Sequence, residues 1–275
     1  MIGMSHSMMW GRKEGEDPLM GGELRLWLDA SDQNTLFDEV SGGNLVTSNG
    51  ASVARWEDKS GNGYHVTQSS SGQRPTLAVA AENGRNCLAF NNDVMVRANA
   101  DLLEDAFTTL TICINSDNNP TGGDAVHHNL LLTPTGASGA SVAMYTRDFG
   151  AQNRFRLNAR RRSIDGATNS VLSPNNSGFN MMWARLYYAT LDPNTKRFAV
   201  SNMGSVSVNT NPGITELGNQ NISIGSNPSV ARHCNGNYAE IRVYRWKNEL
   251  TNQQYIDVSE TILNQLSSKW GVAPI

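Results

Sequence analysis

The stretch Glu23-Leu-Arg-Leu-Trp-Leu-Asp29 decides the fold class, because apolar residues alternate along it with charged or aromatic ones. Leu24, Leu26 and Leu28 fall on one side of this alternation, and a period of two is typical of a β-strand with one buried face. Thr109-Leu-Thr-Ile-Cys-Ile114 repeats the pattern. Both stretches therefore predict strands of a sheet that covers an apolar core.

The rest of the chain favours many short strands joined by turns. Its 275 residues include 31 Asn and 25 Gly, residue types that supply turns. Short apolar segments separated by such residues predict an all-β jelly-roll sandwich of two antiparallel sheets over residues 23–275, following an N-terminal arm over residues 1–22. Further predicted strands lie at 53–56, 87–90, 141–146, 154–158, 181–190, 196–201, 205–208, 221–224 and 238–245.

One helix is predicted at the end of the chain, over about residues 252–269. Thr251 and Gln254 have the spacing of a capping box, and Leu250 and Tyr255 that of a hydrophobic staple. The apolar residues then recur every three or four positions, which indicates one buried stripe. Ser259 falls outside this stripe, so we expect it to face outward. The residues of the stripe are Tyr255, Val258, Ile262, Leu266 and Trp270.

Composition excludes several classes of protein. Charged residues make up 17% of the chain and the net charge is −3, which argues against nucleic-acid binding. No apolar run approaches the length of a membrane span, so no membrane insertion is expected. The three cysteines, Cys87, Cys113 and Cys234, cannot all pair with one another and form no Cys-x-x-Cys motif. A disulfide framework and a zinc ribbon are therefore not expected.

The predicted arm begins with Met1-Ile-Gly-Met-Ser-His-Ser-Met-Met-Trp10, which lacks the charged and apolar regions of a secretory signal. Met8, Met9 and Trp10 could form an apolar plug that anchors the protein to a partner. The alternative is a loosely ordered tail, since a terminus without packing partners stays disordered.

Several blocks of sequence resemble the LamG-like jelly-roll domain of the concanavalin A-like lectin/glucanase superfamily. At the N-terminal end these blocks are 26–32, 53–65, 74–76 and 83–91, and at the C-terminal end they are 224–226, 235–244 and 269–272. The resemblance implies the sandwich fold with a closing strand and a C-terminal helix. Members of this family include sugar-binding, adhesive and phage structural proteins, so the fold alone does not decide the function.

Because the superfamily contains glycosidases, an enzyme of this kind would need two carboxyl groups at the separation of about 5–5.5 Å that retaining hydrolysis requires. Glu57 and Asp58 are adjacent and so point to opposite faces of a strand. Glu240 is the only acid in the segment 238–245. The sequence therefore predicts structural carboxylates and no enzyme activity.

Three aspartates in the blocks of the resemblance are weak candidates for a calcium site. Asp29, Asp32 and Asp58 could supply oxygen ligands. The alternative is that they cap turns and strand ends, which is the interpretation we favour. No cofactor is otherwise expected.

Arginines cluster in the middle of the chain and supply the candidate binding site. Arg154 and Arg156 alternate with apolar residues on one predicted strand, and Arg160, Arg161 and Arg162 follow at a predicted turn. Such a cluster could bind a phosphate, an acidic glycan or an acidic neighbouring subunit; the alternative is a solvated hairpin. Tyr145, Tyr187 and Tyr188 could stack on sugar rings, and one member of the adjacent pair Tyr187–Tyr188 should be accessible.

These observations lead to a functional expectation. A fold suited to extracellular adhesion without a recognisable export signal indicates a non-enzymatic bacteriophage virion surface protein, in the head decoration, a fibre or the tail. Its partners would be other virion proteins, such as a major capsid or tail protein, in a multimeric particle, with host or environmental glycans as candidate ligands. The alternative is a bacterial extracellular carbohydrate-binding adhesion module.

Overall fold

The computed structural model describes the backbone of residues 19–103, 108–117, 126–134, 141–148, 153–160, 169–175, 178–192, 195–202, 205–208, 219–227 and 232–272. Between residues 117 and 218, it describes side chains only for 129–133, 144 and 181–183. The arm residues Met8, Met9 and Trp10, and with them Arg161 and Arg162, lie outside the described residues.

Within these ranges the strands form two sheets, which confirms the all-β sandwich. The sheets are antiparallel except for one parallel bridge between His128 and His233. The eight-stranded sheet has the order β16-β15-β14-β9-β20-β7-β6, with β1 also paired to β20. Its strands are β1 (Glu23–Asp29), β6 (Thr76–Glu82), β7 (Arg85–Phe90), β9 (Thr108–Asp117), β14 (Gly178–Asp192), β15 (Thr195–Asn202), β16 (Ser205–Val208) and β20 (Gly236–Trp246).

The twelve-stranded sheet has the order β13-β12-β11-β10-β17-β8-β5-β4-β2-β3, with β18 and β19 beside β10. Two short 3-10 helices, Gln33–Thr35 and Ser71–Gln73, lie in its connections. Its strands are β2 (Leu36–Glu39), β3 (Gly42–Leu45), β4 (Arg55–Trp56), β5 (Val66–Thr67), β8 (Met95–Ala100), β10 (Val126–Pro134), β11 (Ser141–Asp148), β12 (Asn153–Arg160), β13 (Asn169–Asn175), β17 (Gln220–Ile224), β18 (Ser226–Asn227) and β19 (Arg232–His233).

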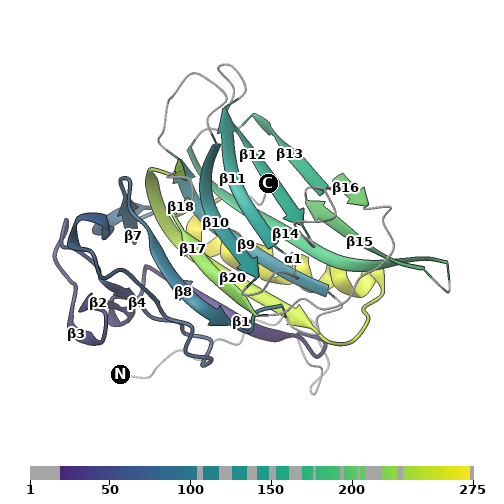
Figure 1. Cartoon of the computed structure of the whole chain (residues 1–275), viewed down its shortest axis with the longest axis horizontal. Helices are drawn as coiled ribbons and strands as arrows, with labels where there is room; N and C mark the ends of the chain where they lie inside the picture. The colour runs from purple at the N-terminus through teal and green to yellow at the C-terminus, as the bar shows by residue number, and fades with distance from the viewer. Residues whose placement is uncertain are drawn as a thin grey trace.

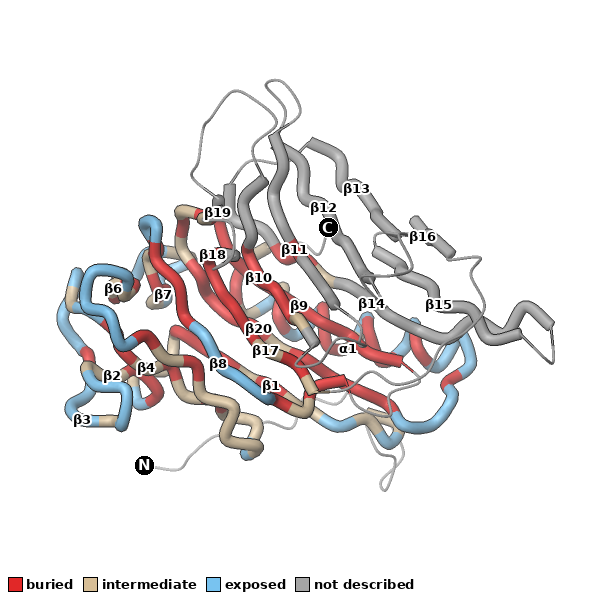
Figure 2. The backbone as a smooth tube through the Cα atoms, in the orientation of Figure 1, coloured by how far each residue is buried: buried red, intermediate tan, exposed pale blue. Residues whose placement is uncertain are grey.

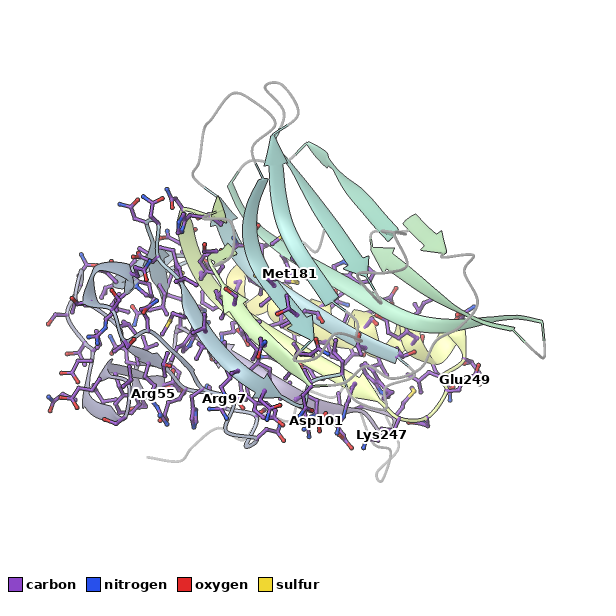
Figure 3. The ribbon with its side chains drawn as sticks, in the orientation of Figure 1. Arg55, Arg97, Asp101, Met181, Lys247 and Glu249 are labelled. Carbon is purple, nitrogen blue, oxygen red and sulfur yellow. The ribbon has the colours of Figure 1, made fainter. Side chains whose placement is uncertain are left out.

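The helix α1 (Asn252–Trp270) adds a third layer behind the eight-stranded sheet (Figure 1). One apolar core lies between the two sheets, and a second lies between the eight-stranded sheet and α1. Figure 2 shows buried residues along β9, β20 and α1, three of the elements that enclose these cores. Met181, labelled in Figure 3, belongs to the core beneath the helix.

The alternation of β20 explains how one strand serves both cores. Ile241 and Val243 are buried between the sheets, whereas Tyr244 and Trp246 are buried beneath α1. β9 does the same with Cys113 on one side and Ile112 on the other. These two strands therefore carry buried apolar residues on both faces, as expected of the middle of a three-layer structure.

β1 departs from the predicted alternation. Leu26 and Leu28 are fully buried in the core between the sheets, but the pairing of β1 with β20 shifts by one residue between Leu24 and Leu26. Leu24 consequently packs against the core beneath the helix. The prediction of one continuous leucine face was wrong. A β-bulge inserts an extra residue, so the residues before the bulge point to the opposite face of the sheet from the one that the alternation predicts.

The helix begins and ends as its capping residues predict. Thr251 and Gln254 form a complete capping box, and Gly271 follows the last turn with a positive φ of 68°. Ser259 is 4% exposed, so the prediction that it faces outward was wrong. The buried stripe includes Val258, Ser259 and Leu263 and is thus wider than a strict three-and-four spacing. Among the described residues, no helix is long and apolar enough to cross a membrane.

The last residues of the predicted arm are packed on the domain. Leu19 and Met20 contact the core beneath the helix, and Trp246 donates its indole N–H to the Leu19 carbonyl at 2.6 Å. Gly22 lies so close to Trp246 that a Cβ at this position would come within 2.5 Å of the indole nitrogen. Residues 19–22 therefore fasten the start of β1 beside the helix.

Candidate functional site

The backbone register brings part of the predicted arginine and tyrosine set together. In the β11–β12 ladder, Arg156 is paired with Tyr145 and Arg154 with Arg147. Opposite residues of an antiparallel pair are nearest neighbours across the strands. These four positions form a two-by-two block of the twelve-stranded sheet, which we call the Arg–Tyr block. Arg147 was not predicted, because only the register shows that it lies opposite Arg154.

The facing of the Arg–Tyr block follows from its neighbours. Met144 is 2% exposed in the core between the sheets, and it is paired with Leu157. Successive positions of a strand fall on opposite faces of the sheet. Positions 145, 147, 154 and 156 therefore fall on the outer face of the twelve-stranded sheet, away from the core.

The other predicted tyrosines are on the opposite layer of the sandwich. Tyr187 and Tyr188 lie in β14 of the eight-stranded sheet. Met182 is buried between the sheets and Trp183 packs beneath the helix, and the pairing with β9 continues without a shift to Tyr187. Position 187 thus falls on the helix side and position 188 on the inter-sheet side. Both positions therefore belong to the other sheet from the Arg–Tyr block.

The aspartates considered as calcium ligands have other partners. Asp58 caps the turn after β4: its carboxylate accepts from the backbone N–H groups of Trp27, Ser60 and Tyr64 at 2.9, 2.9 and 3.0 Å. Asp32 caps the 3-10 helix Gln33–Thr35 and pairs with Lys59 at 2.8 Å, and the pKa of its carboxyl is lowered, chiefly by its hydrogen bond with Lys59.

Lys59 also lies 3.2 Å from Asp29, so its ammonium supplies the positive charge between these two acids. Among the residues that the structure describes, no group of three or more histidine, cysteine or acidic side chains could hold a metal ion. The geometry of Asp29, Asp32 and Asp58 is therefore that of turn caps and ion-pair partners.

The structure corrects the interpretation of Glu240 as an isolated acid. Asp29 of β1 is the ladder partner of Glu240 in β20. Both are buried, and Lys269 Nζ at the end of α1 lies 2.8 Å from Asp29 Oδ2 and 2.7 Å from Glu240 Oε2. The two acids lie in different strands and 211 positions apart, so no pattern along a single strand indicates that they are neighbours.

Glu240 is the centre of this charge network. Its Oε1 accepts from Trp27 Nε1 at 2.7 Å and from Arg242 at 2.6 Å, and its Oε2 accepts from Trp270 Nε1 and from Lys269, both at 2.7 Å. Lys59 and Arg242 lie over the Trp27 ring at 4.3 and 4.7 Å. The network therefore joins β1, β20 and the last turn of α1.

These contacts limit what the two carboxylates can do chemically. A general acid in glycoside hydrolysis needs a raised pKa. Burial alone would raise the pKa of Asp29, but the charge and hydrogen bond of Lys269, together with Ser31 and Lys59, hold it below its usual value. Both carboxylates are occupied by internal donors and lie beneath the helix end, an arrangement suited to cohesion of the layers.

Comparisons with known proteins place few constraints on this chain. No protein-family model matches the sequence, and no curated protein matches it. Among solved structures, an arabinofuranosidase complexed with arabinofuranosyl-α-1,2-xylobiose is 14% identical over 77% of this chain and 50% of its own, with a TM-score of 0.46. The chain thus spans about half the length of that enzyme.

Two further structures are binding modules. The CBM40 of the Ruminococcus gnavus IT-sialidase, bound to α2,3-sialyllactose, is 14% identical over 56% of this chain and 82% of its own, with a TM-score of 0.35. The receptor-binding domain of botulinum neurotoxin type G is 12% identical over 88% and 51%, with a TM-score of 0.47. These similarities are too distant to carry an argument about function.

Proposed function

We propose that this chain is a non-enzymatic, lectin-like jelly roll that binds acidic glycans through the Arg–Tyr block. The observation that carries the proposal is the register of β11 and β12, which pairs Tyr145 with Arg156 and Arg147 with Arg154 on the outer face of the sheet. Planar guanidinium groups suit the bidentate anions of uronic, sialic or sulfated sugars. A neighbouring tyrosine offers an apolar ring for the sugar itself.

The absence of enzyme activity is part of the same proposal. It is supported by the buried Asp29–Glu240 pair, whose oxygens accept from Lys269, Arg242 and two indoles. Carboxylates whose oxygens are bonded to groups of the chain itself are poorly placed to contact the proton of a bound substrate.

Saturable binding of an acidic oligosaccharide tests the proposal. The probes are immobilised sialylated, uronic and sulfated oligosaccharides beside neutral ones, with the full chain as analyte. We expect binding of acidic probes that weakens at high salt. The double variant Arg154→Gln/Arg156→Gln should lose it, whereas Arg97→Gln, at an exposed position of β8 in the same sheet, should retain it.

The variants must keep the thermal unfolding profile of the wild type for this comparison. Equal binding of neutral and acidic probes would refute the anionic specificity. Equal binding by the wild type and the double variant would refute the site, and turnover of any polysaccharide would refute the non-enzymatic part.

For the biological setting, we propose residence on a bacteriophage virion surface, as head decoration, fibre or tail component, rather than a bacterial extracellular adhesion module. The LamG-like resemblance supports this setting, since its family includes phage structural proteins. The described cysteines are buried and form no disulfide, which fits a protein that needs no oxidative folding. Antibody labelling of purified particles tests it, and absence of the protein from intact particles would refute it.

A further inference from the structure

Lys269 occupies an unusual position between two buried carboxyl groups. Its side chain is 22% exposed, whereas those of Asp29 and Glu240 are 5% and 1% exposed. The amine nitrogen lies 2.8 Å from Asp29 Oδ2 and 2.7 Å from Glu240 Oε2. A primary amine is thus held beside one carboxyl that it could attack and a second that could take its proton.

The remaining contacts of Asp29 supply the other groups that an acyl-transfer step requires. Oδ1 accepts from the Ser31 backbone N–H at 3.1 Å and from the Ser31 hydroxyl at 2.6 Å. Two donors on one oxygen stabilise the negative charge that develops there when a nucleophile adds to the carboxyl carbon. Oδ2 has a different neighbour, the Lys59 ammonium at 3.2 Å, which could protonate it as it leaves.

We propose that Lys269 and Asp29 condense to an intramolecular amide bond, with Glu240 as the proton acceptor. In the reacting form, one ammonium proton of Lys269 has moved to Asp29 Oδ2, so that both groups are neutral. Lys269 Nζ then adds to the Asp29 carboxyl carbon, forming the C–N bond, and transfers a second proton to Glu240. Lys59 protonates Oδ2, the bond from the carbon to Oδ2 breaks, and Oδ2 departs as water. The amide nitrogen keeps one of the three ammonium protons and the water carries the equivalent of two. Glu240 and Lys59 regain their resting protonation from solvent.

The resting state of the site sets the expected rate. The amine and the Asp29 carboxyl form an ion pair, so the reaction starts from the small fraction in which both are neutral. We therefore expect the bond to form slowly, after the layers have folded together. Once formed, it would tie the first strand of the domain to the last turn of its helix, and the Trp27 and Trp270 bonds to Glu240 would remain in place.

Intact-mass measurement of the purified full chain tests the proposal directly. After prolonged incubation of the folded protein, we expect a species lighter than the unmodified chain by the mass of one water molecule. Fragmentation after proteolysis should give one branched peptide that contains both Asp29 and Lys269. A folded wild type that keeps its unmodified mass throughout would overturn the proposal.

Matched variants separate this reaction from other losses of water. Lys269→Arg keeps the charge but removes the amine, so it should keep its full mass; water loss from this variant would overturn the assignment. Asp29→Asn should lose ammonia instead of water, and Glu240→Gln should slow the reaction. Lys247→Arg, at an exposed position, should behave as the wild type. If any site variant fails to fold, the wild-type mass and its branched peptide still decide the question.

Discussion

Replacing Glu240 by Gln tests whether the buried carboxylates hold the layers together. The substitution keeps the shape of the side chain and one acceptor oxygen but removes the negative charge that Lys269 and Arg242 share. Removing one partner of a buried ion pair costs about 3–5 kcal/mol, because the remaining charge stays buried without compensation. Since Gln retains an acceptor and Lys269 keeps Asp29, we expect the lower end, about 3 kcal/mol.

The free energy of unfolding can be measured by urea denaturation followed by tryptophan fluorescence, because Trp27 and Trp270 both donate to Glu240. The comparison uses samples whose intact mass is that of the unmodified chain. The midpoint should fall with an unchanged slope. At roughly 2–4 °C per kcal/mol for a domain of this size class, the melting temperature should drop on the order of 10 °C.

Glu260→Gln is the matched control, since Glu260 lies on the same helix and is exposed. Its effect should stay within about 0.5 kcal/mol. A neutral or stabilising Glu240→Gln would refute the reasoning, because that result is typical of carboxylates kept for catalysis at the expense of stability.

Two other predictions concern stability. Gly225→Ala should lower the free energy of unfolding by about 3 kcal/mol, because φ is +80° and a Cβ would come within 2.4 Å of the Phe90 side chain. Gly84→Ala, where φ is +68° and no atom lies within 4 Å of the Cβ, should cost only the backbone strain of about 1 kcal/mol. Thermal or urea unfolding measures both, and equal losses would contradict the packing argument. His65 Nδ1 accepts from the Asp58 N–H, and burial, with the charge of Arg55, lowers its pKa. A lowered histidine pKa gives stability that is present above the usual value of 6.5 and lost as the pH falls through the folded value. His65→Asn, which keeps an acceptor, should therefore flatten the pH dependence of unfolding below about pH 6.5, and an unchanged slope would show that other groups cause it.

The parts of the fold that the sequence predicted are those set by local rules. The helix could be placed to within a residue, because Thr251 and Gln254 cap its start and Gly271 its end. The alternation in residues 109–114 likewise identified β9. Leu24 was misplaced, since a bulge depends on the partner strand rather than on the stretch that contains it.

The charge network was missed for the same reason at longer range. Asp29 and Glu240 are neighbours only once β1 pairs with β20, and Lys269 joins them only once the helix packs on that sheet. The only signal in the sequence was indirect: both acids and Lys269 lie in blocks of the LamG-like resemblance, at the two ends of the chain. For the Arg–Tyr block, the strand pattern identified Tyr145, Arg154 and Arg156, but the register that pairs Tyr145 with Arg156 and adds Arg147 came from the structure.

The pairing of the first strand with the last has a consequence for how the molecule is made. Trp27 and Glu240 are 213 positions apart, yet they are bonded in adjacent strands. During synthesis, Leu26 and Leu28 leave the ribosome long before β20 is made. Until then, their apolar side chains are exposed to water or contact other residues only transiently. Folding of the sandwich can finish only after β20 has left the ribosome, and until then this strand is exposed to aggregation and to chaperones.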